Sequence, residues 1–235
     1  MKLLRKKAVE VAFDDRLSQA GHVEYRFERK KLGRKDRAIV DFLRAQPVAG
    51  KSCLDVGPGT GRWLKFLRSE GASYLAAVDI SSESLKRCVD LCHKTQKADL
   101  ERERLEFPDD SFDLTISFEV LEHLLDPSLY LSELVRVTRP GGVLLFSVPN
   151  VVSLISRIRM VLGGLPPAIS NDPTHVRHYR KTDVSALFER QGLRPSFLPT
   201  SFSLNPLNPK SRFRLPSCTL TSSLDDSLLF YASPD

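Results

Sequence analysis

The sequence lacks any long apolar run, because no stretch approaches the roughly 20 consecutive apolar residues of a transmembrane helix. Its first residues lack the apolar segment and the small-residue cleavage site of a secretory signal peptide. It has only four cysteines, and their spacing matches neither a metal site nor a disulfide framework. These absences argue against membrane-spanning, secreted and disulfide-rich classes, and we predict a cytoplasmic protein.

The chain has 235 residues, of which 41% are hydrophobic, enough for the core of one medium-sized domain. Its net charge of +6 is uneven, because residues 1–51 hold 14 Lys and Arg against 7 Asp and Glu. This basic arm is either the solvated face of amphipathic helices or a surface for an anionic substrate, a nucleic acid or an acidic membrane.

Beyond Pro47, short apolar runs alternate with segments of helical periodicity. Strands are expected at 51–57, 73–81, 97–103, 112–120, 143–150, 194–202 and 225–234, and helices at 62–71, 81–95, 127–142, 153–164 and 181–193. Strands alternating with helices at this interval are typical of parallel sheets. The predicted fold is therefore α/β, a Rossmann-like, doubly wound and mostly parallel seven-stranded sheet with helices on both faces.

The stretch CLDVGPGTGRW places Gly57, Gly59 and Gly61 in a turn between the first strand and the first helix. Such a turn lets a ligand approach the backbone closely. The NAD fingerprint is G-x-G-x-x-G, and the spacing here is one residue tighter, which disfavours an NAD enzyme. Asp55 precedes the first glycine, and Asp79 ends the second strand, where a carboxylate can accept both hydroxyls of a ribose.

LDVGPGTGRW resembles motif I of the class I S-adenosylmethionine-dependent methyltransferases, and AAVDIS resembles their acidic second motif. KADLERERLEFPDDSFDLTISFEVLEHLLDP and LSELVRVTRPGGVLLFSVPN are similar to later motifs of the small-molecule subgroup, which includes ubiquinone and menaquinone methyltransferases. The four motifs occur in the family's order, over residues 50–150.

This resemblance implies that residues 47–235 form a domain that binds S-adenosylmethionine, with S-adenosylhomocysteine as the product. The residues that it places at the cofactor are Asp55, Gly57, Gly59, Gly61, Asp79, Ile80, Asp99, Leu100 and Ser117. The cofactor is a sulfonium with an activated methyl group, so the protein's main task is to align the attacking atom.

The segment EVLEHL is the expected source of a catalytic base. On a helix, Glu119, Glu122 and His123 share one face, and we predict His123 and Glu119 as catalytic residues. The same trio, joined by His175 or His178, also matches the E-x-x-E-H sequence and later histidine of metal-dependent quinone and small-RNA methyltransferases. Many relatives carry EVLEH without a metal, so no metal is predicted.

The acceptor region is less defined by the sequence. Residues 151–181 interrupt the strand–helix rhythm and are predicted to form a substrate lid, with a basic amphipathic helix at 153–164. The predicted substrate-binding residues are Arg157, His175, His178 and Tyr179. Residues 1–46 are predicted to form a basic helical segment over the cofactor pocket, with Tyr25, Arg26 or Arg29 near it, and residues 203–223 an irregular insertion.

The predicted function is methyl transfer from S-adenosylmethionine to an oxygen or nitrogen atom of a small molecule, anionic or sugar-like, by in-line displacement. The expected partner is that acceptor rather than a nucleic acid. No membrane span is expected, and the protein is predicted to be a monomer or a homodimer. Two alternatives stay open. One is an RNA methyltransferase that uses the basic arm, which a steep salt dependence of RNA binding would favour. The other is a non-catalytic binding protein with the same fold.

Overall fold

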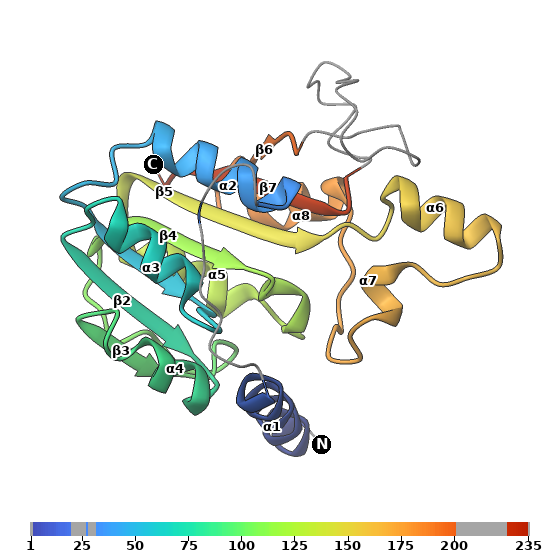
Figure 1. Cartoon of the computed structure of the whole chain (residues 1–235), viewed down its shortest axis with the longest axis horizontal. Coiled ribbons are helices and arrows are strands. Elements are labelled where there is room, and N and C mark those ends of the chain that lie inside the picture. The colour runs from blue at the N-terminus through green and yellow to red at the C-terminus, as the bar shows by residue number, and fades with distance from the viewer. Residues whose placement is uncertain (1, 20–26, 28–31, 201–224, 235) are drawn as a thin grey trace.

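The computed structural model describes residues 2–19, 27, 32–200 and 225–234. Its seven strands form one sheet in the order β3-β2-β1-β4-β5-β7-β6, which confirms the predicted fold class (Figure 1). The strands are β1 (Ser52–Val56), β2 (Tyr74–Asp79), β3 (Lys94–Lys97), β4 (Phe112–Phe118), β5 (Thr138–Pro149), β6 (Ser196–Leu198) and β7 (Ser227–Ala232). Only β7 runs against its neighbours, β5 and β6.

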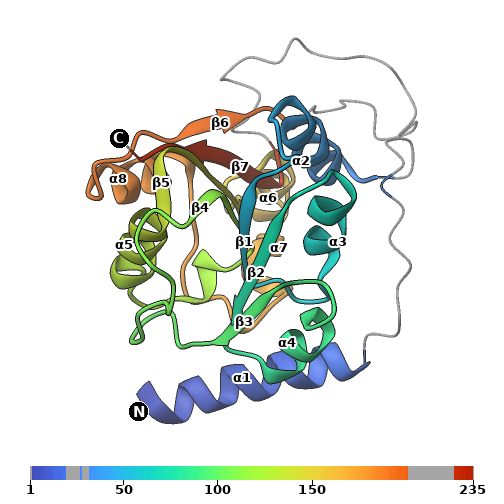
Figure 2. The same cartoon turned by 90° about the vertical axis from the view of Figure 1, so that its left-hand side faces the viewer.

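The described helices cover both faces of this sheet (Figures 1 and 2). They are α1 (Lys2–Gln19), α2 (Arg34–Ala45), α3 (Arg62–Ser69), α4 (Ser82–Cys88), α5 (Ser128–Val137), α6 (Leu154–Val161), α7 (Pro167–Ser170) and α8 (Lys181–Glu189), with a 3-10 turn η1 (Leu121–His123). One buried core cluster joins the sheet to α5 and α8, and a second joins it to α2, α3 and α4. None of the described helices is both long and apolar enough to cross a bilayer.

The central strand shows why both faces are covered. Leu54 and Val56 belong to the cluster under α5, whereas Cys53 belongs to the cluster under α3. Successive side chains of a strand point to opposite faces, so a strand that is apolar on both faces needs a helix layer on each. The same pairing brings the carboxyl ends of β1, β2, β3 and β4 to one edge of the sheet.

Several predicted boundaries are wrong. The helix expected at 127–142 ends at Val137, and the strand expected at 143–150 begins at Thr138, so Pro140, Gly141 and Gly142 belong to β5. The helix expected at 81–95 ends at Cys88, and the strand expected at 97–103 is instead β3 at Lys94–Lys97. The strand KTQK lies at the edge of the sheet and is mostly polar, so its sequence carries no apolar pattern. Its one buried side chain, Gln96, donates to the Arg104 carbonyl and accepts from the Glu106 N–H. Asp99 and Leu100 therefore follow the strand instead of lying inside it.

Several predictions fall outside the described residues. They are the placement of Tyr25, Arg26 and Arg29 and the insertion at 203–223. Within 151–181 the chain forms α6, α7 and connecting turns, and in Figure 1 α6 projects from the body of the molecule.

Candidate active site

A cavity of about 500 Å³ lies at the carboxyl ends of β1 to β4. Each of these strands contributes residues at or shortly after its carboxyl end, which is where doubly wound sheets bind ligands. The predicted site residues that line the cavity are Gly57, Gly59, Asp79, Ile80, Asp99, Leu100, Glu119 and His123. The fold therefore brings together residues that are up to 66 positions apart in the sequence.

The glycine turn after β1 forms one wall of the cavity. Gly59 has a φ of +54°, and a Cβ atom added there would meet no atom within 4 Å, so its backbone faces open space. Gly57 has a φ of +76°, and a Cβ atom there would overlap the side chain of Val120, which follows β4. The turn is therefore held close to the β4 end and leaves its backbone accessible to a ligand.

Two carboxyl groups lie beneath this turn. Asp79 accepts hydrogen bonds from the Ser81 N–H (2.9 Å) and the Ser84 hydroxyl (2.6 Å), and burial raises its pKa. Asp55 is buried and does not line the cavity, and its Oδ2 has no hydrogen-bond partner among the described residues. Burial, followed by the nearby charge of Asp79, raises the pKa of Asp55 well above its usual value. The two groups cannot both be charged without repulsion.

Helix α1 covers the cavity and lies across the ends of β2 and β3, beside α4 (Figure 2). Val9, Phe13, Arg16 and Leu17 line the cavity, and Asp14 accepts from the Ser81 hydroxyl and the Glu83 N–H. These residues were not among the predicted site residues, although the spacing of Val9, Phe13 and Leu17 marks one helical face.

Glu119 is not helical, contrary to the prediction for EVLEHL. It has a φ of +57°, and only Leu121–His123 form a helical turn, of the 3-10 type. Its carboxylate accepts from the Ser147 hydroxyl (2.7 Å) and forms an ion pair with Lys35 (2.9 Å). Glu119, Glu122 and His123 therefore do not share one helical face, although Glu119 lines the same cavity as His123 and its charge acts on Glu122.

His123 is held in one tautomer by the segment that follows α7. Its Nδ1 lies 3.3 Å from the Thr174 carbonyl and 3.1 Å from the Thr174 hydroxyl, which itself donates to Asp172 (2.6 Å). A carbonyl only accepts, so Nδ1 carries the proton and Nε2 keeps its lone pair. Burial and the neighbouring His175 lower the pKa of His123 to about 4, which leaves the imidazole neutral at pH 7.

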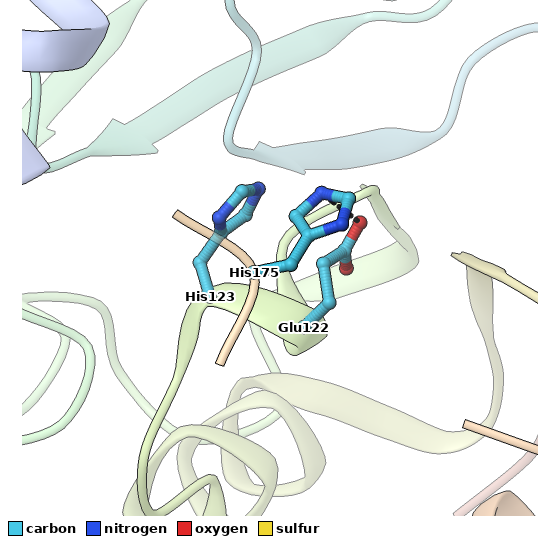
Figure 3. A group of neighbouring side chains, drawn as sticks. All are labelled: Glu122, His123 and His175. Carbon is cyan, nitrogen blue, oxygen red and sulfur yellow. Dashed lines mark ion pairs between the residues drawn. The ribbon is translucent and has the colours of Figure 1, made fainter. Parts of the chain in front are cut away.

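Glu122, His123 and His175 form a cluster whose ligand atoms lie within 4.8 Å of one another (Figure 3). Glu122 is 1% exposed, and neither of its carboxylate oxygens has a hydrogen-bond partner among the described residues. His175 donates from Nδ1 to the Ala168 carbonyl (2.8 Å), and its Nε2 lies 3.8 Å from Glu122 Oε1. Burial, followed by the charge of Glu119, raises the pKa of Glu122 well above its usual value. The Nε2 atoms of the two histidines and the carboxylate of Glu122 are all hydrogen-bond acceptors that face one another. A proton or a cation between them is required to offset their repulsion.

Other predicted site residues lie away from the cavity. Gly61 precedes α3, and the Ser117 hydroxyl is buried between the Val56 carbonyl and the Tyr130 hydroxyl. Tyr179 is buried, with its hydroxyl 3.4 Å from the Leu121 carbonyl. The remaining two, Arg157 and His178, are exposed. The structure therefore brings only His175, of the four predicted substrate-binding residues, beside the catalytic candidates.

A family model described as a methyltransferase domain matches residues 24–195. A probable S-adenosylmethionine-dependent methyltransferase from Mycolicibacterium smegmatis is 31% identical over 153 residues, which are 63% of this chain and 54% of that protein. A ubiquinone biosynthesis O-methyltransferase from Neisseria meningitidis is 28% identical over 109 residues, covering 44% of this chain and 46% of that protein. The matched region thus spans about half the length of these curated relatives.

A similar solved structure is the magnesium protoporphyrin IX methyltransferase of Synechocystis, which holds bound S-adenosylhomocysteine. Its TM-score is 0.61 at 17% identity, over 98% of this chain and all of that chain. At this identity the likeness concerns the fold alone.

Proposed function

We propose, from the premise that this chain belongs to the methyltransferase-domain family, that it transfers a methyl group from S-adenosylmethionine to an oxygen atom of a small molecule. The observation that supports this most directly is the convergence of the glycine turn, Asp79 and His123 on one cavity. The RNA-methylating alternative stays a prediction, since no described residue tests it.

The residues around the cavity suit S-adenosylmethionine. The backbone at Gly59 faces open space, so an amino-acid moiety can lie against it without meeting a side chain. Asp79 ends β2 at the cavity wall and is the residue proposed to accept from the ribose hydroxyls. Ile80, Asp99 and Leu100 are proposed to surround the adenine, with apolar surface against the ring and a carboxylate for its amino group.

When bound, S-adenosylmethionine supplies an electrophilic methyl group on a positively charged sulfur. The chain's own contribution is to orient the acceptor hydroxyl and to take its proton. His123 suits this role, because it lines the cavity, is neutral and has its lone pair on Nε2. Asp172 and Thr174 act as positioning residues, since their hydrogen bonds fix the ring's tautomer.

The acceptor is proposed to be a hydroxyl compound with a sizeable apolar body. Phe13, Val120, Leu124 and Leu125 line the cavity near His123, and the Phe13 ring stands edge-to-face with the imidazole at 5.0 Å. Arg16 also lines the cavity, but it forms a 2.7 Å ion pair with Asp172. An apolar compound therefore fits this wall better than the anionic or sugar-like acceptor expected from the sequence.

Calorimetric titration with S-adenosylhomocysteine tests the cofactor assignment. We expect micromolar binding by the wild type and binding weakened by about 100-fold in Asp79→Asn, since charge-assisted hydrogen bonds to a carboxylate contribute about 1.5–3 kcal/mol. Asp90→Asn, at an exposed position on the loop after α4, is the matched control and is expected to bind like the wild type. A folded wild type that does not bind the ligand would overturn the proposal.

A second role for the same cluster is favoured by the carboxylate of Glu122, which has no hydrogen-bond partner in the described part of the chain. Each histidine has its Nδ1–H bound to a carbonyl, the arrangement that usually fixes metal-ligating imidazoles. Glu122, His123 and His175 would therefore hold a divalent cation, and such a cation would supply charge that favours ionisation of the acceptor hydroxyl.

Removal of metal distinguishes the two proposed roles of His123, general base and metal ligand. If the cluster holds a cation, EDTA should lower the rate of methyl transfer at least about ten-fold, and Mn²⁺ or Mg²⁺ should restore it. The His175→Ala variant should then gain nothing from added metal. If the rate is the same after EDTA treatment as before, the metal role is wrong and His123 acts as the base alone.

A further inference from the structure

Helix α6 and the segment after it expose apolar side chains to an unusual degree. Ten large apolar side chains are exposed in the described part of the chain, and seven of them lie between residues 155 and 169. They are Ile155, Ile158, Met160, Val161, Leu162, Leu165 and Ile169, here called the α6 apolar surface. Val161 is 86% exposed and Leu162 is 79% exposed.

The amphipathic pattern of α6 is inverted relative to a helix that packs on a core. Ser153 and Ser156 are buried and hydrogen-bonded to each other at 2.9 Å, whereas Ile155 and Ile158 face outward. A soluble domain usually directs its serines outward and its isoleucines inward. The sequence predicted an amphipathic helix here, and the structure places its apolar side away from the protein. A segment so rich in exposed apolar side chains is typical of a surface that contacts a partner.

The charges of this segment point to the kind of partner. Residues 151–170 contain Arg157 and Arg159, both exposed, and no Asp or Glu. A symmetric contact between two copies would set these arginines near their own counterparts with no acidic residue in the segment to pair them. Apolar side chains interleaved with arginines instead match the lipid–water interface of an anionic bilayer, where phosphate groups pair with guanidinium groups.

We propose that the α6 apolar surface docks this protein onto anionic lipid bilayers. The apolar side chains would enter the interface, and Arg157 and Arg159 would contact lipid phosphates. In Figure 1, α6 projects from the sheet, so no other described element covers this side of the helix. The same segment continues to Thr174 and His175 at the catalytic cluster, which links the docking surface to the acceptor side of the cavity. The proposal itself does not depend on methyl transfer.

Co-sedimentation with lipid vesicles tests this proposal. The wild type should sediment with vesicles of phosphatidylcholine and phosphatidylglycerol, and much less with vesicles of phosphatidylcholine alone. In Val161→Ser/Leu162→Ser the partition coefficient on the mixed vesicles should fall at least about ten-fold, because much exposed apolar area is lost. Arg157→Gln/Arg159→Gln should lower the binding mainly at low salt. The control is Val11→Ser/Val89→Ser, which changes two exposed valines elsewhere and should bind like the wild type.

Results from either of two experiments would overturn the proposal. The first is sedimentation, if the wild type stays in solution with mixed vesicles or the Val161→Ser/Leu162→Ser variant still sediments fully. The second is light scattering with size-exclusion chromatography. If the wild type is a dimer that this variant converts to a monomer, and vesicles bind neither protein, then the surface is an interface between two copies.

Discussion

Glu122→Gln is expected to raise the free energy of unfolding of the metal-free protein by about 2 kcal/mol at pH 8, since a buried charge without partners is destabilising by at least that amount. The same change should lower the rate of methyl transfer at least about 100-fold, because the carboxylate charge favours either a proton on His123 or a bound cation. Glutamine has the shape of glutamate, and its amide can donate to the His175 Nε2 that faces the carboxylate.

The gain in stability should depend on pH. Burial raises the folded-state pKa of Glu122 above its ordinary value of 4.5, so the folded state holds more protons than the unfolded state at intermediate pH. The wild type therefore loses stability as pH rises above about 4.5 and through the folded pKa, whereas the Glu122→Gln variant lacks this loss. Below about pH 4.5 the carboxyl is neutral in both states, and the two proteins should be nearly equally stable.

Urea denaturation at several pH values after EDTA dialysis measures this difference. Glu106→Gln, at an exposed position, is the matched control and should change neither stability nor rate. A Glu122→Gln variant that is less stable than the wild type at pH 8, with an unchanged rate, would show that the carboxylate is a structural element and not part of a functional site.

The fold was predictable because the central strands are buried on both faces. These strands are apolar runs that end in a glycine or an acidic residue, and such runs are visible directly in the sequence, as in CLDVG and YLAAVD. The edge strand β3 was misplaced because KTQK buries only Gln96, through hydrogen bonds to residues 104 and 106. Such contacts between separate segments leave no periodic signal.

The cavity residues that end strands were predictable for the same reason, since their positions follow from the sheet. Two features were not. Glu119 adopts a left-handed backbone and lies outside the 3-10 turn that holds Glu122 and His123, whereas local propensity assigned all three to one helix. The hydrogen bonds of His123 come from Thr174, 51 residues away, and depend on the path of a connecting segment that has no regular pattern.

Gly57→Ala is expected to lower the free energy of unfolding by about 3 kcal/mol, about 1 from its left-handed backbone and about 2 from overlap with Val120. Val120 lies between Glu119 and the turn that carries His123, so its displacement should also weaken the binding of S-adenosylhomocysteine at least about ten-fold. The glycine turn after β1 thus packs closely against the end of β4.

A double-mutant cycle separates strain from overlap. In Gly57→Ala/Val120→Ala the new methyl group has room, so the cycle should show a favourable coupling of about 1–2 kcal/mol, with the backbone strain remaining. Gly50→Ala is the matched control for that strain, because Gly50 has nearly the same φ of +75° and a Cβ atom there meets nothing within 4 Å. It should lower stability by only about 1 kcal/mol and leave ligand binding unchanged. If Gly50→Ala and Gly57→Ala are equally destabilising, contact between the two turns does not shape the cavity, and glycine is needed at position 57 for its backbone alone.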